Sequence, residues 1–158
     1  MCIRDSLSQA NSFWHMREHI TLAQAAEGAN LKHDITVPLS ALESFIQETD
    51  HLIRAQYPGV RIINFGHLGD GNLHYNIAPP EGVDAQAFNL AYEKPVHELV
   101  YGQVERCGGS ISAEHGVGQL KLEGLRAHKG AVAHDLMKTL KRALDPQNIL
   151  NPHKVVSI

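Results

Sequence analysis

The order of strand-like and helix-like segments between residues 31 and 113 constrains the fold more than any other feature of the sequence. Four short segments are predicted strands, at 31–37, 60–65, 73–78 and 110–113. Two segments with apolar residues at helical spacing separate them, at about 42–56 and 84–106. The order β-α-β-β-α-β predicts an α+β fold of the ferredoxin-like type, with an antiparallel sheet and helices on one face.

Further helices are predicted outside this unit. Apolar residues at helical spacing predict a helix over 12–27, which ends at Gly28. Ser40 and Glu43 have the spacing of a capping box for the helix that follows. A last helix, at about 132–144, stops before Asp145-Pro146 and begins a C-terminal helical tail.

Alternation along the strands predicts which side chains share a face of the sheet. Leu73, Tyr75 and Ile77 alternate with His74 and Asn76. The apolar set should pack against the helices, so the polar set should face the opposite side. Lys32 has the same polar phase on the first strand. Polar groups from separate strands are therefore expected to converge on the open face.

Charge and composition exclude several classes of protein. The formal net charge is −3, and the sequence has no basic run, which argues against nucleic acid as the main partner. No apolar stretch approaches the roughly 18–20 residues that a transmembrane helix needs. Cys2 and Cys107 form neither a CxxC motif nor a disulfide framework, which predicts a cytoplasmic location. The sequence is unusually rich in histidine, with 11 residues, and histidine is a common metal ligand.

Two clusters combine residues that bind metals. His67 and His74 flank a turn rich in glycine, and Glu114-His115 enters a Gly-x-Gly loop. His67, His74 and Glu114 would form a set of two histidines and one carboxylate, which suits a divalent metal such as Zn²⁺. An unligated His115 beside it could act as a general base. The alternative is that these are ordinary loop and sheet residues.

A third group could bind an anion. Arg17 and Thr21 lie four residues apart and so share a helix face, and Lys32 adds a charge on the polar face of the sheet. Together they could hold an anionic substrate, or they could be solvated surface residues.

These motifs resemble a known family. Gly66-His-Leu-Gly-Asp-Gly-Asn-Leu-His74, Ser112-Ala-Glu-His-Gly-Val-Gly118 and Leu144-Asp-Pro-Gln-Asn-Ile-Leu-Asn-Pro152 occur in this order. They are similar to the C-terminal region of FAD-linked 2-hydroxyacid dehydrogenases, which are vanillyl-alcohol-oxidase-type flavoproteins. This family includes D-lactate dehydrogenase and the glycolate oxidase flavin subunit, and the D-2-hydroxyglutarate dehydrogenase group is most similar.

The resemblance implies roles for individual residues. It implies that His67, His74 and Glu114 bind a divalent metal, usually zinc, and that His115 is the catalytic base. It implies substrate binding by Arg17, Thr21, Lys32 and Asn76, and cofactor binding by Asn151. The implied reaction is oxidation of a D-2-hydroxy acid (2-hydroxyglutarate, lactate or glycolate) to the 2-oxo acid, with hydride transfer to flavin.

The resemblance also implies a division of the chain. Residues 1–6 resemble translated sequencing-adapter sequence and are expected to be non-native. Residues 7–130 would form a substrate or cap domain, and 131–158 a helix and tail that return to an FAD-binding domain. Nothing in this sequence resembles that domain, so most of the FAD contacts, and the activity, would belong to a longer parent protein.

Two other functions stay open from the residues alone. One is a metal-dependent hydrolase, in which the metal activates water. The other is a non-catalytic ferredoxin-like module that binds a metal or a small acid. The expected partners are a small 2-hydroxy acid, an unidentified electron acceptor and, in a homodimer, a second copy of the chain.

Overall fold

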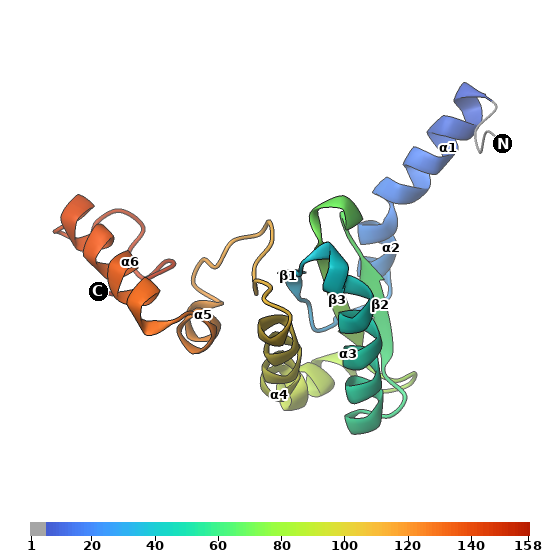
Figure 1. The fold of residues 1–158 in the computed structure, drawn as a ribbon. Helices are drawn as coiled ribbons and strands as arrows, with labels where there is room; N and C mark the ends of the chain where they lie inside the picture. The colour runs from blue at the N-terminus through green and yellow to red at the C-terminus, as the bar shows by residue number, and fades with distance from the viewer. Residues whose placement is uncertain (1–5) are drawn as a thin grey trace.

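A small antiparallel sheet organises the computed structural model, which describes residues 6–158. Strands β1 (Asp34–Thr36), β3 (Asn72–Ala78) and β2 (Arg61–Phe65) lie side by side in that order. Helices α3 (Leu42–Gln56) and α4 (Ala85–Arg106) pack on one face of it (Figure 1). The predicted α+β class, with an antiparallel sheet and helices on one face, is confirmed. The other elements are α1 (Leu7–Glu18), α2 (Ile20–Ala26), η1 (Leu39–Ala41), η2 (Leu68–Asp70), α5 (Leu122–His128) and α6 (Ala131–Leu144).

The hydrophobic core lies between the sheet and these two helices. Ile35, Tyr75 and Ile77 are fully buried on the helix-facing side of β1 and β3. They join apolar residues of α3 and α4 in one cluster, which includes Phe45, Ile53, Val96, Val100 and Val104. Burying each large apolar side chain contributes about 1.5–3 kcal/mol. The Tyr75 hydroxyl donates to Asp50 Oδ1 at 2.7 Å, so the polar end of this buried ring is also satisfied.

The fourth predicted strand, 110–113, is reduced to a single bridge. Ser110 pairs with Thr36 at the outer edge of β1, the position expected of the last strand in a ferredoxin-like sheet. Beyond Ser110 the regular ladder ends: the Ala113 N–H still donates to the Asp34 carbonyl at 3.2 Å, but the N–H groups of Glu114 and His115 hydrogen-bond to the Asp34 carboxylate. The strand is therefore shortened by a side chain that captures its backbone donors.

Two helices form where the sequence predicted one over 12–27, and the first begins before residue 12. It begins at Leu7, where the Ser6 side chain accepts a hydrogen bond from the Gln9 N–H at 3.2 Å. The chain then breaks at His19 between α1 and α2. The capping box at Ser40 is wrong, because Ser40 lies inside η1 and α3 starts without a side-chain cap.

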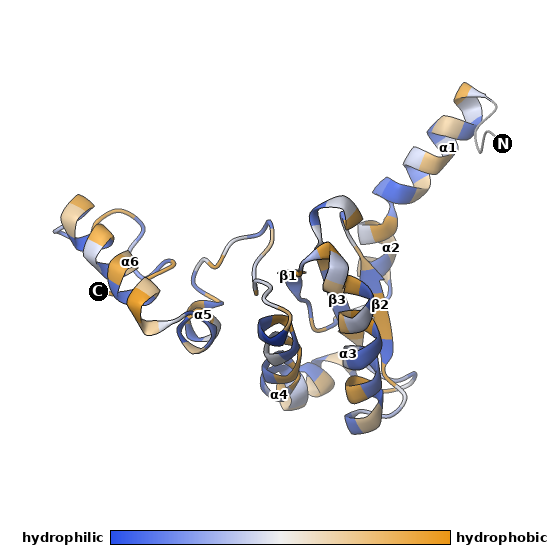
Figure 2. Cartoon of the chain, viewed as in Figure 1, coloured by the Kyte–Doolittle hydropathy of each residue, from blue (hydrophilic) through white to orange (hydrophobic). Residues whose placement is uncertain are grey.

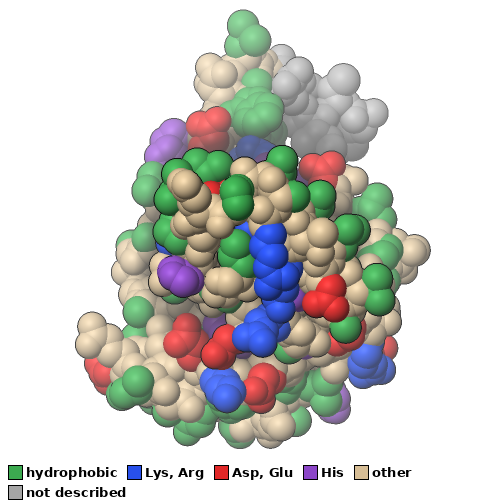
Figure 3. Space-filling view, turned by 90° about the vertical axis from the view of Figure 1, so that its left-hand side faces the viewer, with side chains coloured by type: hydrophobic (Ala, Val, Ile, Leu, Met, Phe, Trp, Pro, Cys, Tyr) green, Lys and Arg blue, Asp and Glu red, His purple; other side chains and the backbone are tan. Residues whose placement is uncertain are grey.

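Helices α1 and α6 extend away from the sheet (Figure 1). Orange and blue alternate along α6 in Figure 2, and four of its apolar side chains are exposed: Val132, Leu136, Leu140 and Leu144. Figure 3 views the molecule from the side where α6 lies, and hydrophobic side chains are visible there among charged ones. Within residues 6–158, no helix is both long and apolar enough to cross a membrane. Of the predicted non-native segment 1–6, residues 1–5 lie outside the described part.

The buried His33 pairs with the partly buried His97 of α4. His33 Nδ1 donates to the Tyr75 carbonyl at 2.7 Å, so its Nε2 accepts from His97 Nδ1 at 2.8 Å. Burial, together with the nearby His97, lowers the pKa of His33 to about 3. The pKa of His97 is also lowered by burial. Both rings therefore stay neutral in the folded chain near neutral pH.

This pair should make stability depend on pH. The unfolded chain protonates His33 near its ordinary pKa of 6.5, but the folded chain does so only near 3. The neutral His33 ring therefore makes its full contribution to the free energy of unfolding above pH 6.5, and this contribution is lost as the pH falls from 6.5 toward 3. We expect His33 alone to reduce the free energy of unfolding by about 2 kcal/mol between pH 7 and pH 5.

Urea unfolding at the two pH values measures this loss. His33→Gln keeps a donor for Tyr75 but removes the titrating ring, so it should flatten the pH dependence. His51→Gln, at an exposed position on α3, should not. An unchanged slope in His33→Gln would contradict the assignment.

Candidate functional site

A cavity of about 480 Å³ opens on the face of the sheet that α3 and α4 leave uncovered. Its walls come from α2, β1, the end of β2, β3 and the loop that follows the Ser110 bridge. The alternation of β3 turns His74 and Asn76 into this cavity, while Tyr75 and Ile77 enter the core. Lys32 also lines the cavity, so the structure brings together the polar residues that alternation placed on the open face.

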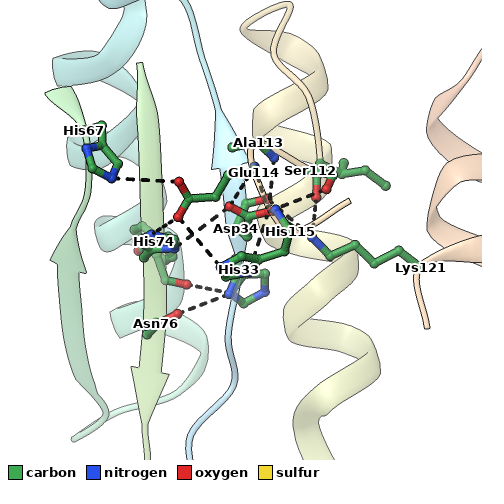
Figure 4. A network of polar contacts seen from close by, with 12 residues as sticks. His33, Asp34, His67, His74, Asn76, Ser112, Ala113, Glu114, His115 and Lys121 are labelled. Atoms are coloured by element: carbon green, nitrogen blue, oxygen red, sulfur yellow. Dashed lines mark hydrogen bonds and ion pairs between the residues drawn. The ribbon is translucent and has the colours of Figure 1, made fainter. Parts of the chain in front are cut away.

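The three predicted metal ligands meet at the Glu114 carboxylate (Figure 4). Glu114 Oε1 lies 3.0 Å from His74 Nε2, and its Oε2 lies 3.8 Å from His67 Nε2. His74 comes from β3, and His67 precedes η2 at the other end of the glycine-rich turn. An imidazole nitrogen and a carboxylate in contact, as in His74 and Glu114, are donors suited to a divalent cation. His67 approaches this pair only through Glu114: it does not line the cavity, and it is not in the group of residues whose ligand atoms all lie within 4.8 Å of one another.

His115, the predicted base, stands beside this set. Its ring stacks on His74 with centroids 5.3 Å apart. Its Nε2 lies 3.7 Å from Glu114 Oε1, and its Nδ1 lies 3.8 Å from Asp34 Oδ2. The side chain is 64% exposed. A ring in this position can exchange a proton with a molecule in the cavity and with solvent.

Asp34 lies beneath the ligands and was not predicted as a site residue. Its side chain is 4% exposed, and it accepts backbone N–H bonds from Ala113, Glu114 and His115 at 2.9–3.3 Å. Burial would raise the pKa of this carboxyl, but the N–H donors, His115 and Lys121 bring it below its ordinary value. Asp34, His74, Glu114 and His115 each offer a ligand atom within 4.8 Å of the others.

Lys121 is a second residue that the sequence did not reveal. Its Nζ donates to the Ile111 carbonyl at 3.0 Å and lies 3.7 Å from Asp34 Oδ2. Burial lowers the pKa of Lys121, and the charge of Asp34 opposes that shift. The alternation over 31–37 groups Asp34 with Lys32 and Thr36 on the polar face, but it gives Asp34 no role in the site. No sequence signal indicates Lys121.

The predicted substrate residues divide into two groups. Thr21, Lys32 and Asn76 line the cavity. Asn76 is fixed, because its Oδ1 accepts from the His33 N–H at 3.2 Å and its Nδ2 donates to Gln24 at 3.0 Å.

Arg17 and Asn151 do not line the cavity. Arg17 instead donates from Nη2 to His67 Nδ1 at 3.2 Å. Asn151, the predicted cofactor residue, is exposed on the C-terminal tail. The same tail reaches the cavity loop through a hydrogen bond from Val155 N to the Gly118 carbonyl.

The chain matches known proteins over nearly its whole length. The family model for FAD linked oxidases, C-terminal domain, matches residues 2–155. The chain is 39% identical to a D-2-hydroxyglutarate dehydrogenase of Xanthomonas citri pv. viticola over 97% of its length. It is 36% identical to D-2-hydroxyglutarate dehydrogenases of Stutzerimonas stutzeri and Arabidopsis thaliana (the latter mitochondrial), over 95% and 98% of its length. The chain spans 32%, 32% and 26% of these relatives, in that order.

The glycine-rich turn places His67 and His74 through close backbone contacts. Gly71 has a left-handed backbone (φ 66°), and a Cβ there would collide with the Val37 carbonyl. Its own carbonyl accepts from the Val37 N–H at 3.0 Å. Gly69, in the same turn, has open space where a Cβ would lie.

This difference gives a matched pair of substitutions. Gly71→Ala should lower the free energy of unfolding by at least about 2 kcal/mol, through backbone strain and the collision with Val37. Gly69→Ala should change it by less than about 1 kcal/mol. Urea unfolding followed by circular dichroism measures both, and equal effects would show that Gly71 is not constrained in this way.

Proposed function

The chain belongs to the family of FAD-linked oxidase C-terminal domains, and from that membership we propose that it binds the substrate of a D-2-hydroxyacid dehydrogenase. D-2-Hydroxyglutarate is the favoured substrate, since relatives at 36–39% identity carry that name. One observation carries the proposal: the His74–Glu114–His115 cluster and the Lys32 ammonium line one cavity. The cluster at one part of the cavity wall would bind the α-hydroxy acid group of the substrate. The Lys32 ammonium at another part would bind a second negative charge.

His67, His74 and Glu114 are the residues that would hold a divalent metal, with zinc the favoured ion. Both histidines approach the Glu114 carboxylate, with His74 Nε2 3.0 Å from Oε1 and His67 Nε2 3.8 Å from Oε2. A bound metal supplies Lewis-acid polarisation of the substrate hydroxyl and carboxylate. The protein supplies the orientation, because His74 is fixed in β3 and Glu114 follows the Ser110 bridge.

Lys32 supports a substrate with a second carboxylate. Within residues 6–158, no acidic side chain lies within ion-pair distance of Lys32. Its charge is therefore available to an anion in the cavity. Thr21 and Asn76 add polar groups to the same wall. Arg17 would also bind the substrate anion once its hydrogen bond to His67 is broken.

His115 is the proposed general base. Its Nδ1 faces Asp34, so its Nε2 is the atom that would accept the hydroxyl proton of the substrate. Proton transfer of this kind contributes about 10²–10⁴-fold to a rate. FAD, when bound, supplies the acceptor for the hydride from the α-carbon. Because His115 is exposed, it can pass the proton on to solvent.

Other parts of the proposal concern the whole protein. Residues 7–130 would form the substrate or cap domain, and 131–158 the tail through which Asn151 contacts the flavin. The electron acceptor, a homodimeric state and a cytoplasmic location remain predictions. Cys107 is a free thiol, in keeping with a reducing compartment.

Metal binding is the most direct test of the ligand set. Purified chain should hold close to one divalent metal per molecule, measured by elemental analysis after dialysis. His74→Ala removes the most buried of the three ligands and should lose most of the metal. His51→Ala, on the exposed side of α3, is the matched control and should keep it. Equal metal content in the two variants would exclude His74 as a ligand.

The activity can be tested in a chimera. This chain would replace the matching segment of the Xanthomonas citri relative, and flavin reduction would be followed with D-2-hydroxyglutarate, D-lactate and glycolate. We expect the highest kcat/KM with D-2-hydroxyglutarate. His115→Ala should lower kcat by about 10²–10⁴-fold without loss of metal.

Lys32→Met tests the second carboxylate. It should raise KM for D-2-hydroxyglutarate more than for D-lactate, since only the former has a distal carboxylate. If the chimera holds FAD and metal but none of the three acids reduces its flavin, the proposed reaction is rejected.

A further inference from the structure

The Asp34 side chain is the most heavily hydrogen-bonded carboxylate in the cavity wall. It lies on β1 and is 4% exposed. It accepts from the N–H groups of Ala113, Glu114 and His115, and from the Ser112 hydroxyl at 3.5 Å (Figure 4). Successive backbone N–H groups that point at one anion form a concave binding site for it. Here that anion is a side chain of the protein itself.

This arrangement argues against Asp34 as a metal ligand, although its oxygens lie close to those of the cluster. A carboxylate offers about four acceptor positions. Three backbone donors, one hydroxyl and the Lys121 ammonium already surround Asp34. A cation bound by Asp34 would displace these donors, and the partly buried N–H groups of Glu114 and His115 would lose their hydrogen-bond acceptor. The Glu114 carboxylate instead lies beside the rings of His67, His74 and His115, which can themselves act as ligands.

Two of the donors to Asp34 are backbone N–H groups of Glu114 and His115, the proposed metal ligand and the proposed base. The N–H groups of Glu114 and His115 both end on this carboxylate, at 3.3 and 2.9 Å. Asp34 also faces His74 Nδ1 at 3.9 Å and His115 Nδ1 at 3.8 Å. Its negative charge favours a proton on Nδ1 of each ring, which leaves Nε2 directed at Glu114.

We propose that Asp34 is a positioning residue: it anchors the Ser112–His115 backbone to β1, so that Glu114 and His115 are held in place for metal and substrate, and it is not a metal ligand. This inference rests on the proposed metal site. Lys121 belongs to the same anchor, because its Nζ bonds the carbonyls of Asp34 and Ile111 at 3.4 and 3.0 Å.

Co²⁺ titration of the intact chain tests the role of Asp34. The visible spectrum of bound Co²⁺ reports the ligand set, and the titration gives the affinity. Asp34→Asn should weaken Co²⁺ binding by about 10–100-fold, as loss of an outer contact to a metal site does. At saturation its spectrum should match that of the unsubstituted chain. Asp135→Asn, at an exposed position on α6, should change neither quantity.

Three outcomes would overturn the proposal. A changed spectrum at saturation would make Asp34 a ligand. An unchanged affinity would mean that the ligands hold their places without Asp34. The third is rapid hydrogen exchange at the amides of Ala113, Glu114 and His115 in the metal-free unsubstituted chain, because the proposal requires these amides to be protected.

The exchange measurement also separates the two proposals. If the unsubstituted chain binds no Co²⁺, the metal site fails, but protected amides at 113–115 would still support the anchor. This measurement needs no substituted protein, so it decides the anchor even where Asp34→Asn does not fold.

Discussion

The two-residue period of the central strand β3 is the constraint on which both the core and the site depend. Tyr75 and Ile77 enter the apolar cluster, while His74 and Asn76 between and beside them line the cavity. Pairing on both sides fixes this phase, since His74 lies opposite Asp34 of β1 and Phe65 of β2. A slip of one residue would move the histidine into the core and the tyrosine into the cavity. The packing that stabilises the sheet therefore also positions the candidate ligand.

A buried polar layer connects the core to the cavity. His33, Asp34 and Asn76 are nearly inaccessible to solvent, yet each has hydrogen-bond partners that match its chemistry. Burying an unpaired carboxylate would cost several kcal/mol. The Asp34 charge is instead compensated by backbone donors from a segment about 80 residues further along the chain. These hydrogen bonds attach the Glu114 loop to the sheet, where a full fourth strand would have attached it through a backbone ladder.

Local patterns predicted the part of this structure that depends on local physics. Alternation placed Lys32, His74 and Asn76 on one face because the period of a strand is independent of tertiary context. The same reasoning missed the break at His19, where the ring packs on His15 one turn earlier, and the shortening of 110–113, which depends on contacts with the distant Asp34. Asp34 was missed for a related reason. A sequence shows that a residue is acidic, but not that three distant backbone N–H groups will converge on it.

The Arg17–His67 contact links the two candidate binding functions of the cavity. A guanidinium only donates, so His67 Nδ1 must accept, and a neutral His67 ring then carries its proton on Nε2, the atom that faces Glu114. An imidazole that ligates through Nε2 carries its proton on Nδ1 instead, and that nitrogen can no longer accept from Arg17. The guanidinium must then leave His67, which frees it for another anion. The residue that sequence similarity assigns to the substrate is thus held by a residue assigned to the metal, and both assignments cannot be fulfilled until this contact breaks.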